Sequence, residues 1–127
     1  MNFLSRSLIL LPAAFIAAVS FAQGVGSSPV FVLNSLDGNV SVVDPQTWRE
    51  VKRLPTGKEP HHLYMTPDEK SIIVANALGD TLTFIDPRTA DVQKTIRGVI
   101  DPYHLRFSPD MKWLVTAGNR ENGGGRA

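Results

Sequence analysis

The sequence predicts an all-β fold in which short antiparallel sheets recur along the chain. The first observation is an internal repeat, because Val32-Leu33-Asn34 returns 42 residues later as Val74-Ala75-Asn76. The second is a turn motif, Thr66-Pro67-Asp68-Glu69-Lys70, which returns at the same offset as Ser108-Pro109-Asp110-Met111-Lys112. The third is that the segments between turns are short and rich in β-branched and aromatic residues, as strands are. A period of roughly 40 to 45 residues also occurs in helical repeats, and the strand-like segments favour propeller blades instead.

Turn residues divide the chain into nine expected strands. Leu36-Asp37-Gly38-Asn39 and Leu78-Gly79-Asp80 contain residues that tolerate positive φ, as tight hairpins require. Pro67 and Pro109 each favour a type I turn, since the proline ring fixes φ near about −65°. The expected strands cover residues 30–34, 40–44, 50–55, 62–66, 71–76, 81–86, 91–97, 104–108 and 113–117.

The four middle strands complete one meander, which corresponds to one blade of a β-propeller. The first strand of a blade lines the central channel, so residues 62–66 and 104–108 are expected to be channel strands. A closed ring has roughly four to eight blades. We therefore expect a partial β-propeller of about two four-stranded antiparallel blades over residues 30–118, as the N-terminal fragment of a truncated product, and a disordered tail at 119–127. A self-assembling oligomer of two-blade units is the alternative.

The first residues resemble an export signal. Residues 8–19 form an apolar run broken only by Pro12, and Ser20-Phe21-Ala22 places small residues at a cleavage site. We predict a signal peptide over 1–22, a linker over 23–29 and a periplasmic or secreted mature chain. A membrane anchor is the competing interpretation, but a spanning helix needs about 20 apolar residues. A lipid anchor is excluded because the chain has no cysteine.

Charge and motif content exclude several function classes. With 13 basic and 12 acidic residues the formal net charge is +1, so no basic excess predicts nucleic-acid binding. No nucleophile elbow, phosphate loop, dinucleotide fingerprint or cysteine nucleophile is present. We expect no nucleic-acid partner, no membrane contact after cleavage of the leader, and no catalytic residue, metal ligand or cofactor within this chain.

The repeated motifs resemble the YVTN family of β-propeller repeats, which is related to the seven-bladed lactonase-like and cytochrome d1-like propellers. The motifs are Val74-Ala75-Asn76, Ile85-Asp86, Gly57-Lys58-Glu59-Pro60 and Ser108-Pro109-Asp110-Met111-Lys112. Glu69 and Met111 stand where the family usually has glycine, and Gly118 stands where a third asparagine would fall. The resemblance implies a propeller fold over residues 30–118. It leaves function open, because members look like binding platforms, lactonases or cofactor-dependent redox domains.

The candidate binding residues are His61, His62, Tyr103 and His104. His62 and His104 occupy the same place in successive repeats, each at the start of a channel strand, and His61 and Tyr103 precede them. Such a cluster at the channel mouth could bind an anion, a metal ion or a planar cofactor. The alternative is that each histidine forms a hydrogen bond with the backbone of a neighbouring blade.

Other repeated polar residues are expected to be structural. Asp44 and Asp86 precede prolines at strand ends, where a carboxylate accepts hydrogen bonds from turn amides. Asp68 and Asp110 occupy turn positions of the same kind. The two tryptophans, Trp48 and Trp113, are expected to be packing residues.

The sequence therefore favours an exported propeller that acts as a binding or scaffold module without independent activity. Its partner would be a protein or a small-molecule ligand. The alternatives, which concern a longer parent protein, are a lactonase-like hydrolase that activates water in the channel and a redox domain that holds haem or a quinone.

Overall fold

The computed structural model describes residues 28–120. The predicted signal peptide, most of the predicted linker and residues 121–127 of the predicted tail lie outside this range. Within it, nine strands follow one another with a single short 3-10 turn at Ala77–Gly79. The strands are β1 (Val30–Asn34), β2 (Asn39–Asp44), β3 (Arg49–Pro55), β4 (Pro60–Met65), β5 (Ile72–Asn76), β6 (Thr81–Ile85), β7 (Val92–Arg97), β8 (His104–Phe107) and β9 (Leu114–Ala117).

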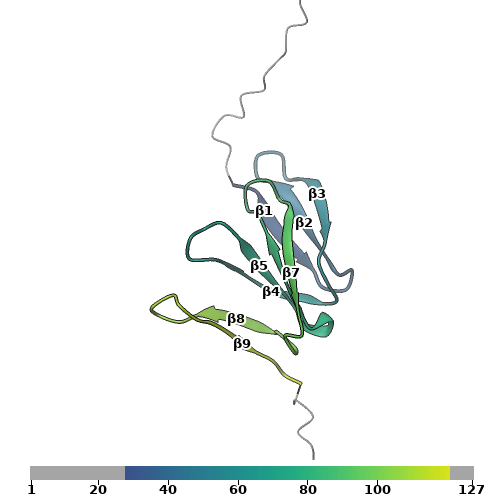
Figure 1. Cartoon of the computed structure of the whole chain (residues 1–127). Coiled ribbons are helices and arrows are strands. Elements are labelled where there is room, and N and C mark those ends of the chain that lie inside the picture. Colours follow the sequence, from purple (N-terminus) through teal and green to yellow (C-terminus); the bar gives the residue numbers. More distant parts are fainter. Residues whose placement is uncertain (1–27, 121–127) are drawn as a thin grey trace, which may run out of the picture.

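The strands form three antiparallel sheets, each a meander of neighbours in sequence. The orders are β1-β2-β3, β4-β5-β6-β7 and β8-β9. Figure 1 shows the four-stranded sheet between the other two. This arrangement confirms the partial propeller, with one complete blade over β4–β7. Within residues 28–120, no helix is long and apolar enough to cross a membrane.

The central strand β5 supplies both interfaces between the sheets, because neighbouring residues of a strand point to opposite faces. Ile72 and Val74 belong to the cluster that joins the first and second sheets, and Ile73 and Ala75 to the cluster that joins the second and third. All five residues of β5 are buried. We call these interfaces the first junction and the second junction. The first contains Val40, Val42, Leu54, Ile72, Val74, Ile85 and Ala90, and the second contains Ile73, Ala75, Leu82 and Leu105.

The turns repeat the backbone geometry of the sequence repeat. Glu69 and Met111, which stand where glycine is usual in the family, both have positive φ, 57° and 58°. The amide of each donates a hydrogen bond of 2.8 Å to the carbonyl three residues earlier. A side chain in this left-handed region costs roughly 1–2 kcal/mol. Three further pairs 42 residues apart also have positive φ: Gly38 and Asp80, Trp48 and Ala90, Glu59 and Asp101.

The repeated aspartates cap these turns. Asp44 accepts hydrogen bonds from the Gln46 amide, at 2.8 Å, and from the Thr47 hydroxyl. Asp86 accepts one from the Arg88 amide at 2.8 Å. These donors lower the pKa of both carboxyl groups. Asp68 and Asp110 play the same part in their own turns, where the donors are Thr66 with Lys70 and Ser108 with Lys112.

The expectation that the tryptophans are packing residues is not met among residues 28–120. Trp48 is 73% exposed and Trp113 is 71% exposed. Trp48 occupies a turn position with φ of 55°, between β2 and β3. Trp113 precedes β9 at the edge of the two-stranded sheet, where no further strand covers it within residues 28–120.

Candidate functional site

Four rings from two neighbouring sheets meet where the strands β4 and β8 begin. His61 and His62 lie at the start of β4, beside a register shift between Pro60 and His62. His104 is the first residue of β8, and Tyr103 directly precedes it. The Tyr103 amide donates hydrogen bonds to the carbonyls of Asp101 and Ala117. These bonds fix the start of β8, so the sequence repeat brings equivalent residues of two blades side by side. We call these four residues the ring cluster.

The four side chains are in ring contact with one another. His61 and Tyr103 are stacked, with centroids 3.5 Å apart. His104 lies 5.1 Å from His62, 5.2 Å from Tyr103 and 6.2 Å from His61. The four residues that the sequence selected therefore form one cluster. Rings arranged in this way can also stack against the planar group of a ligand.

His62 has a structural role within the ring cluster. Its Nδ1 accepts a hydrogen bond from the Leu105 amide at 3.1 Å. Burial lowers the pKa of His62, and the nearby charges of His104 and His61 lower it further. A neutral imidazole is the form that can accept at Nδ1. The alternative that the sequence left open, a hydrogen bond to the backbone of the neighbouring blade, is thus confirmed for His62.

His61 and His104 differ from His62 in their surroundings. His104 is exposed. The Nδ1 atom of His61 is buried, and no hydrogen-bond partner for it exists within residues 28–120. The same residues contain no group of three or more His, Cys, Asp or Glu side chains placed to hold a metal ion. The rings of the cluster offer stacking faces and imidazole hydrogen bonding.

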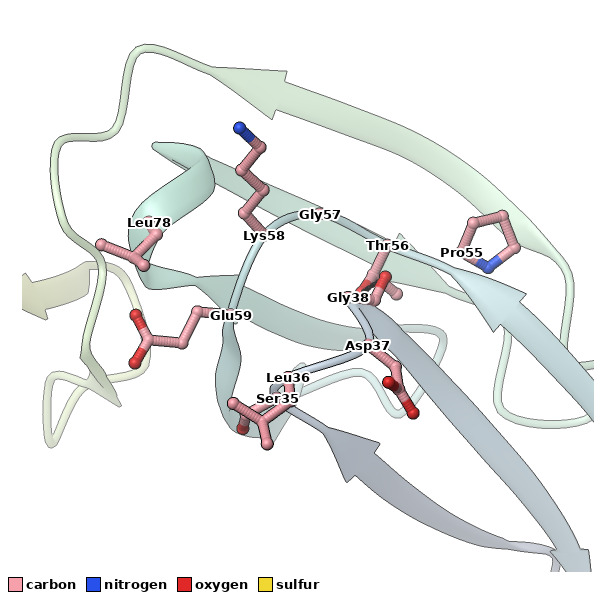
Figure 2. A pocket seen from close by; sticks show the side chains of 10 residues that line it. All are labelled: Ser35, Leu36, Asp37, Gly38, Pro55, Thr56, Gly57, Lys58, Glu59 and Leu78. Carbon is pink, nitrogen blue, oxygen red and sulfur yellow. Dashed lines mark hydrogen bonds between the residues drawn. The ribbon is translucent and has the colours of Figure 1, made fainter.

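A groove between the first and second sheets lies outside the sequence predictions. Its volume is about 690 Å³. Figure 2 shows that its walls come from the β1–β2 turn, the link between β3 and β4, and the turn after β5. The lining residues are Ser35, Leu36, Asp37, Gly38, Pro55, Thr56, Gly57, Lys58, Glu59 and Leu78. Four of them were predicted to lie in turns, Leu36, Asp37, Gly38 and Leu78, and three belong to a family motif, Gly57, Lys58 and Glu59, but the sequence predicted no site there.

A charged network at the second junction was also missed. Arg120 donates from Nη2 to the Ala77 carbonyl at 2.9 Å and contacts the Asp80 carboxylate. Asp101 is only 4% exposed and accepts hydrogen bonds from the Asn119 and Arg120 amides. Residues 119 and 120, which the sequence assigned to the tail, are thereby held against the second sheet. The signal available was the repeat itself, which places Arg120 at the position of Leu78.

Asp101 also explains one departure from the family pattern. A Cβ atom at Gly118 would lie 2.3 Å from the Asp101 carbonyl oxygen. The space for an asparagine like Asn76 is therefore taken. At the equivalent place in the second blade, the Asn76 amide instead donates to the hydroxyls of Thr81 and Thr83, each at 3.0 Å.

Solved structures of other proteins contain a similar arrangement of strands. Hydrazine synthase of Kuenenia stuttgartiensis matches with a TM-score of 0.61 and 26% identity, over 72% of this chain and 26% of that chain. Dihydro-haem d1 dehydrogenase NirN, in complex with DHE, matches with a TM-score of 0.60 and 20% identity, over 74% of this chain and 21% of that one. A putative 6-phosphogluconolactonase from Bacteroides uniformis matches with a TM-score of 0.53 and 16% identity, over 69% and 29%.

The chain thus spans between a fifth and a third of the length of these solved chains. No curated protein matches it significantly. The resemblance to lactonase-like and cytochrome d1-like propellers is confirmed at the level of the fold. A family model described as the YNCE-like β-propeller matches residues 5–124, and this chain belongs to that family.

Proposed function

We propose that this chain is the binding part of an exported β-propeller and that it holds a small planar or anionic ligand at the ring cluster. The observation that carries the proposal is the stacking of His61 on Tyr103, 3.5 Å apart, next to an exposed His104. These side chains come from two blades, so a ligand there contacts both sheets at once. The proposed compartment is the periplasm or the exterior, reached through the predicted leader.

The different hydrogen bonding of the three histidines in the ring cluster supports a binding role. His62 is engaged by the Leu105 amide, so it holds the two blades in register. The buried Nδ1 of His61 has no partner within residues 28–120, and a buried polar atom without a partner carries a free-energy cost. His104 supplies a further imidazole from the open side.

We further propose that additional blades complete a ring around these sheets. The third sheet has only two strands within residues 28–120, and Trp113 and Val115 on it are exposed. A large exposed apolar surface marks an interaction site. Another blade seated on the third sheet covers this surface. The share of the solved propellers that this chain spans agrees with that arrangement.

Benzoate, a planar anion, is a direct probe of the ring cluster. We expect a benzoate titration of the full chain to shift the NMR signals of His61, Tyr103 and His104. We expect His104→Ala to weaken benzoate binding about tenfold, the scale of a lost charge-assisted hydrogen bond. Gln93→Ala, on the outer strand β7, is the control and should bind normally. Unchanged affinity in His104→Ala contradicts the proposal.

The two alternative functions predict different results with the same protein. A redox propeller requires haem to bind with a new absorbance band that His104→Ala abolishes. A lactonase-like hydrolase requires hydrolysis of a sugar lactone that depends on the ring cluster. Either result replaces the binding module as the function of this site.

A further inference from the structure

The repeat makes the two junctions directly comparable at one position. Leu78, in the turn after β5, and Arg120, after β9, lie 42 residues apart and are therefore equivalent. Glu59 and Asp101 are equivalent in the same way, and both have positive φ. The contacts of Arg120 at the second junction therefore indicate which kind of group fits the equivalent place at the first junction.

At the second junction, Arg120 reaches across to the turn of the blade before it. Its guanidinium binds the Ala77 carbonyl at 2.9 Å and contacts the Asp80 carboxylate. The Arg120 Nε also lies 3.9 Å from the carboxylate of Asp101. One cationic side chain thus links a backbone carbonyl and two carboxylates.

At the first junction, no cation takes this place from within residues 28–120. Leu78 stands where Arg120 would be, and Gly38 stands where Asp80 would be. Leucine has no donor, so it cannot make the contacts of Arg120, and a groove of about 690 Å³ lies between the sheets here. Glu59 lines the groove at the position of Asp101. Figure 2 shows that Lys58 points away from Glu59.

The charges and the apolar surface of the groove agree in the ligand they favour. Two carboxylates, Asp37 and Glu59, and one ammonium group, Lys58, line it, and neither carboxylate forms a salt bridge among residues 28–120. Leu36 is fully exposed beside them, and Leu78 is 58% exposed. Acidic groups next to apolar side chains suit a cation carried on an apolar stem. Arginine has that composition, and its planar fork matches a carboxylate.

We propose that the groove binds an arginine side chain from a segment of a partner protein. The guanidinium pairs with the Glu59 carboxylate and with the Ser35 carbonyl, which is the equivalent of the Ala77 carbonyl. The stem of the arginine and the neighbouring apolar residues of the partner lie against Leu36 and Leu78. This site shares no residue with the ring cluster, so it stands or falls separately from the proposed function.

The test uses the full chain and two synthetic peptides, acetyl-Leu-Arg-Leu-amide and the same peptide with citrulline in place of arginine. Citrulline keeps the shape but has no charge. We expect the arginine peptide to shift the NMR signals of Gly38, Gly57 and Glu59. We expect the citrulline peptide to bind about tenfold more weakly, as the loss of a charge-assisted hydrogen bond predicts. Equal binding of the two peptides overturns the proposal.

Two variants test the groove by independent routes. Glu59→Gln removes the charge and should weaken the arginine peptide about tenfold. Leu78→Arg supplies the cation from within the chain, as Arg120 does at the second junction, and should abolish binding of the peptide. Glu69→Gln is the matched control, because Glu69 is also a glutamate with positive φ but lies in the turn between β4 and β5. The Glu69→Gln variant should bind the arginine peptide with the same affinity as the unchanged chain.

A third variant tests the comparison on which the proposal depends. Arg120→Ala empties the equivalent place at the second junction, so the arginine peptide should then bind at two places instead of one, with new shifts at Asp80 and Asp101. A folded Leu78→Arg that still binds the peptide, or an Arg120→Ala with no second binding event, overturns the proposal. The dispersion of the amide spectrum shows whether each variant is folded.

Discussion

The two junctions are built from the same 42-residue repeat but are held together by different chemistry. The first is aliphatic, with seven buried apolar residues and the partly buried Phe31, Leu33 and Leu63 packed against them. The second has four buried apolar residues and aromatic neighbours such as Tyr64 and Phe107. Polar contacts cross both junctions. Those of the first include the exposed Lys52–Asp91 ion pair, whereas those of the second, the Arg120 network and the bond from Leu105 to His62, involve the buried Asp101 and the partly buried His62. A repeat thus fixes the shape of an interface without fixing what stabilises it.

The difference implies that the junctions respond to different perturbations. Apolar burial does not depend on the protonation of side chains, whereas ion pairs and buried imidazoles do. Exposed ion pairs are also weakened by salt. The first junction should therefore fail when side-chain volume is removed, because its ion pair, Lys52–Asp91, is exposed and exposed pairs contribute little. The second should fail when charge or protonation changes.

The largest effect is expected from Ile85→Ala at the first junction. Ile85 is fully buried in the aliphatic cluster. Its truncation leaves a cavity and should lower the free energy of unfolding by about 3 kcal/mol, measured by urea unfolding. Val92→Ala, at a 43% exposed position on β7, is the control and should cost far less. A small effect for Ile85→Ala would mean that apolar volume does not hold this junction.

Asp101→Asn should have the next largest effect, confined to the second junction. Asp101 accepts two backbone amides and lies near Arg120. Both amides donate to Oδ2, and the neutral oxygen of an amide side chain would accept them without the negative charge that also attracts Arg120, so we expect a loss of about 2 kcal/mol. Hydrogen exchange should show faster exchange in β8 and β9 than in β2. Equal acceleration in all sheets would contradict a polar second junction.

Acid should weaken the second junction through His62. Burial, and after it the charges of His104 and His61, place the pKa of His62 in the folded chain below its ordinary value. The unfolded chain therefore binds the proton first, so the contribution of His62 is complete above about pH 6.5 and is lost as pH falls toward the lowered folded value. The effect should be smaller than that of Asp101→Asn. His62→Gln should flatten the stability profile between about pH 7 and 5.

The smallest effect is expected from glycine in the two equivalent turns. Glu69→Gly and Met111→Gly relieve a side chain at positive φ, and each should raise the free energy of unfolding by about 0.5–1 kcal/mol, after the entropy of the added glycine is subtracted. Thermal unfolding measures the gain. Lys70→Gly, next to Glu69 but without positive φ, should instead destabilise the chain.

Most of the fold could be predicted from the sequence, because local signals and the repeat agree. The first strand was predicted with the bounds it has, Val30–Asn34. The predicted start of β4, residue 62, was two residues late. Proline is rarely part of a strand ladder, but Pro60 pairs with Asn76, and the register shift follows it. The ring cluster could be predicted because equivalent residues at the start of inner strands must lie near one another.

The groove and the Arg120 network could not be predicted in the same way. Arg120 was grouped with the polar glycine-rich end of the chain, where composition suggests no packing. Its contacts depend on how far one turn extends over the turn of the preceding blade, which strand patterns do not encode. The repeat aligns Leu78 with Arg120 in the sequence. The sequence does not show that Arg120 contacts the Asp80 carboxylate, and this contact gives the alignment its importance.

The burial of every residue in β5 has a consequence for how this protein can change over evolution. Ordinary surface strands offer alternate positions at which substitution is neutral, but from Ile72 to Asn76 none faces solvent. A substitution scan of stability should therefore show five consecutive intolerant sites, Ile72 to Asn76. Substitutions that change what the protein binds must then occur in the loops, because β5 packs against both neighbouring sheets.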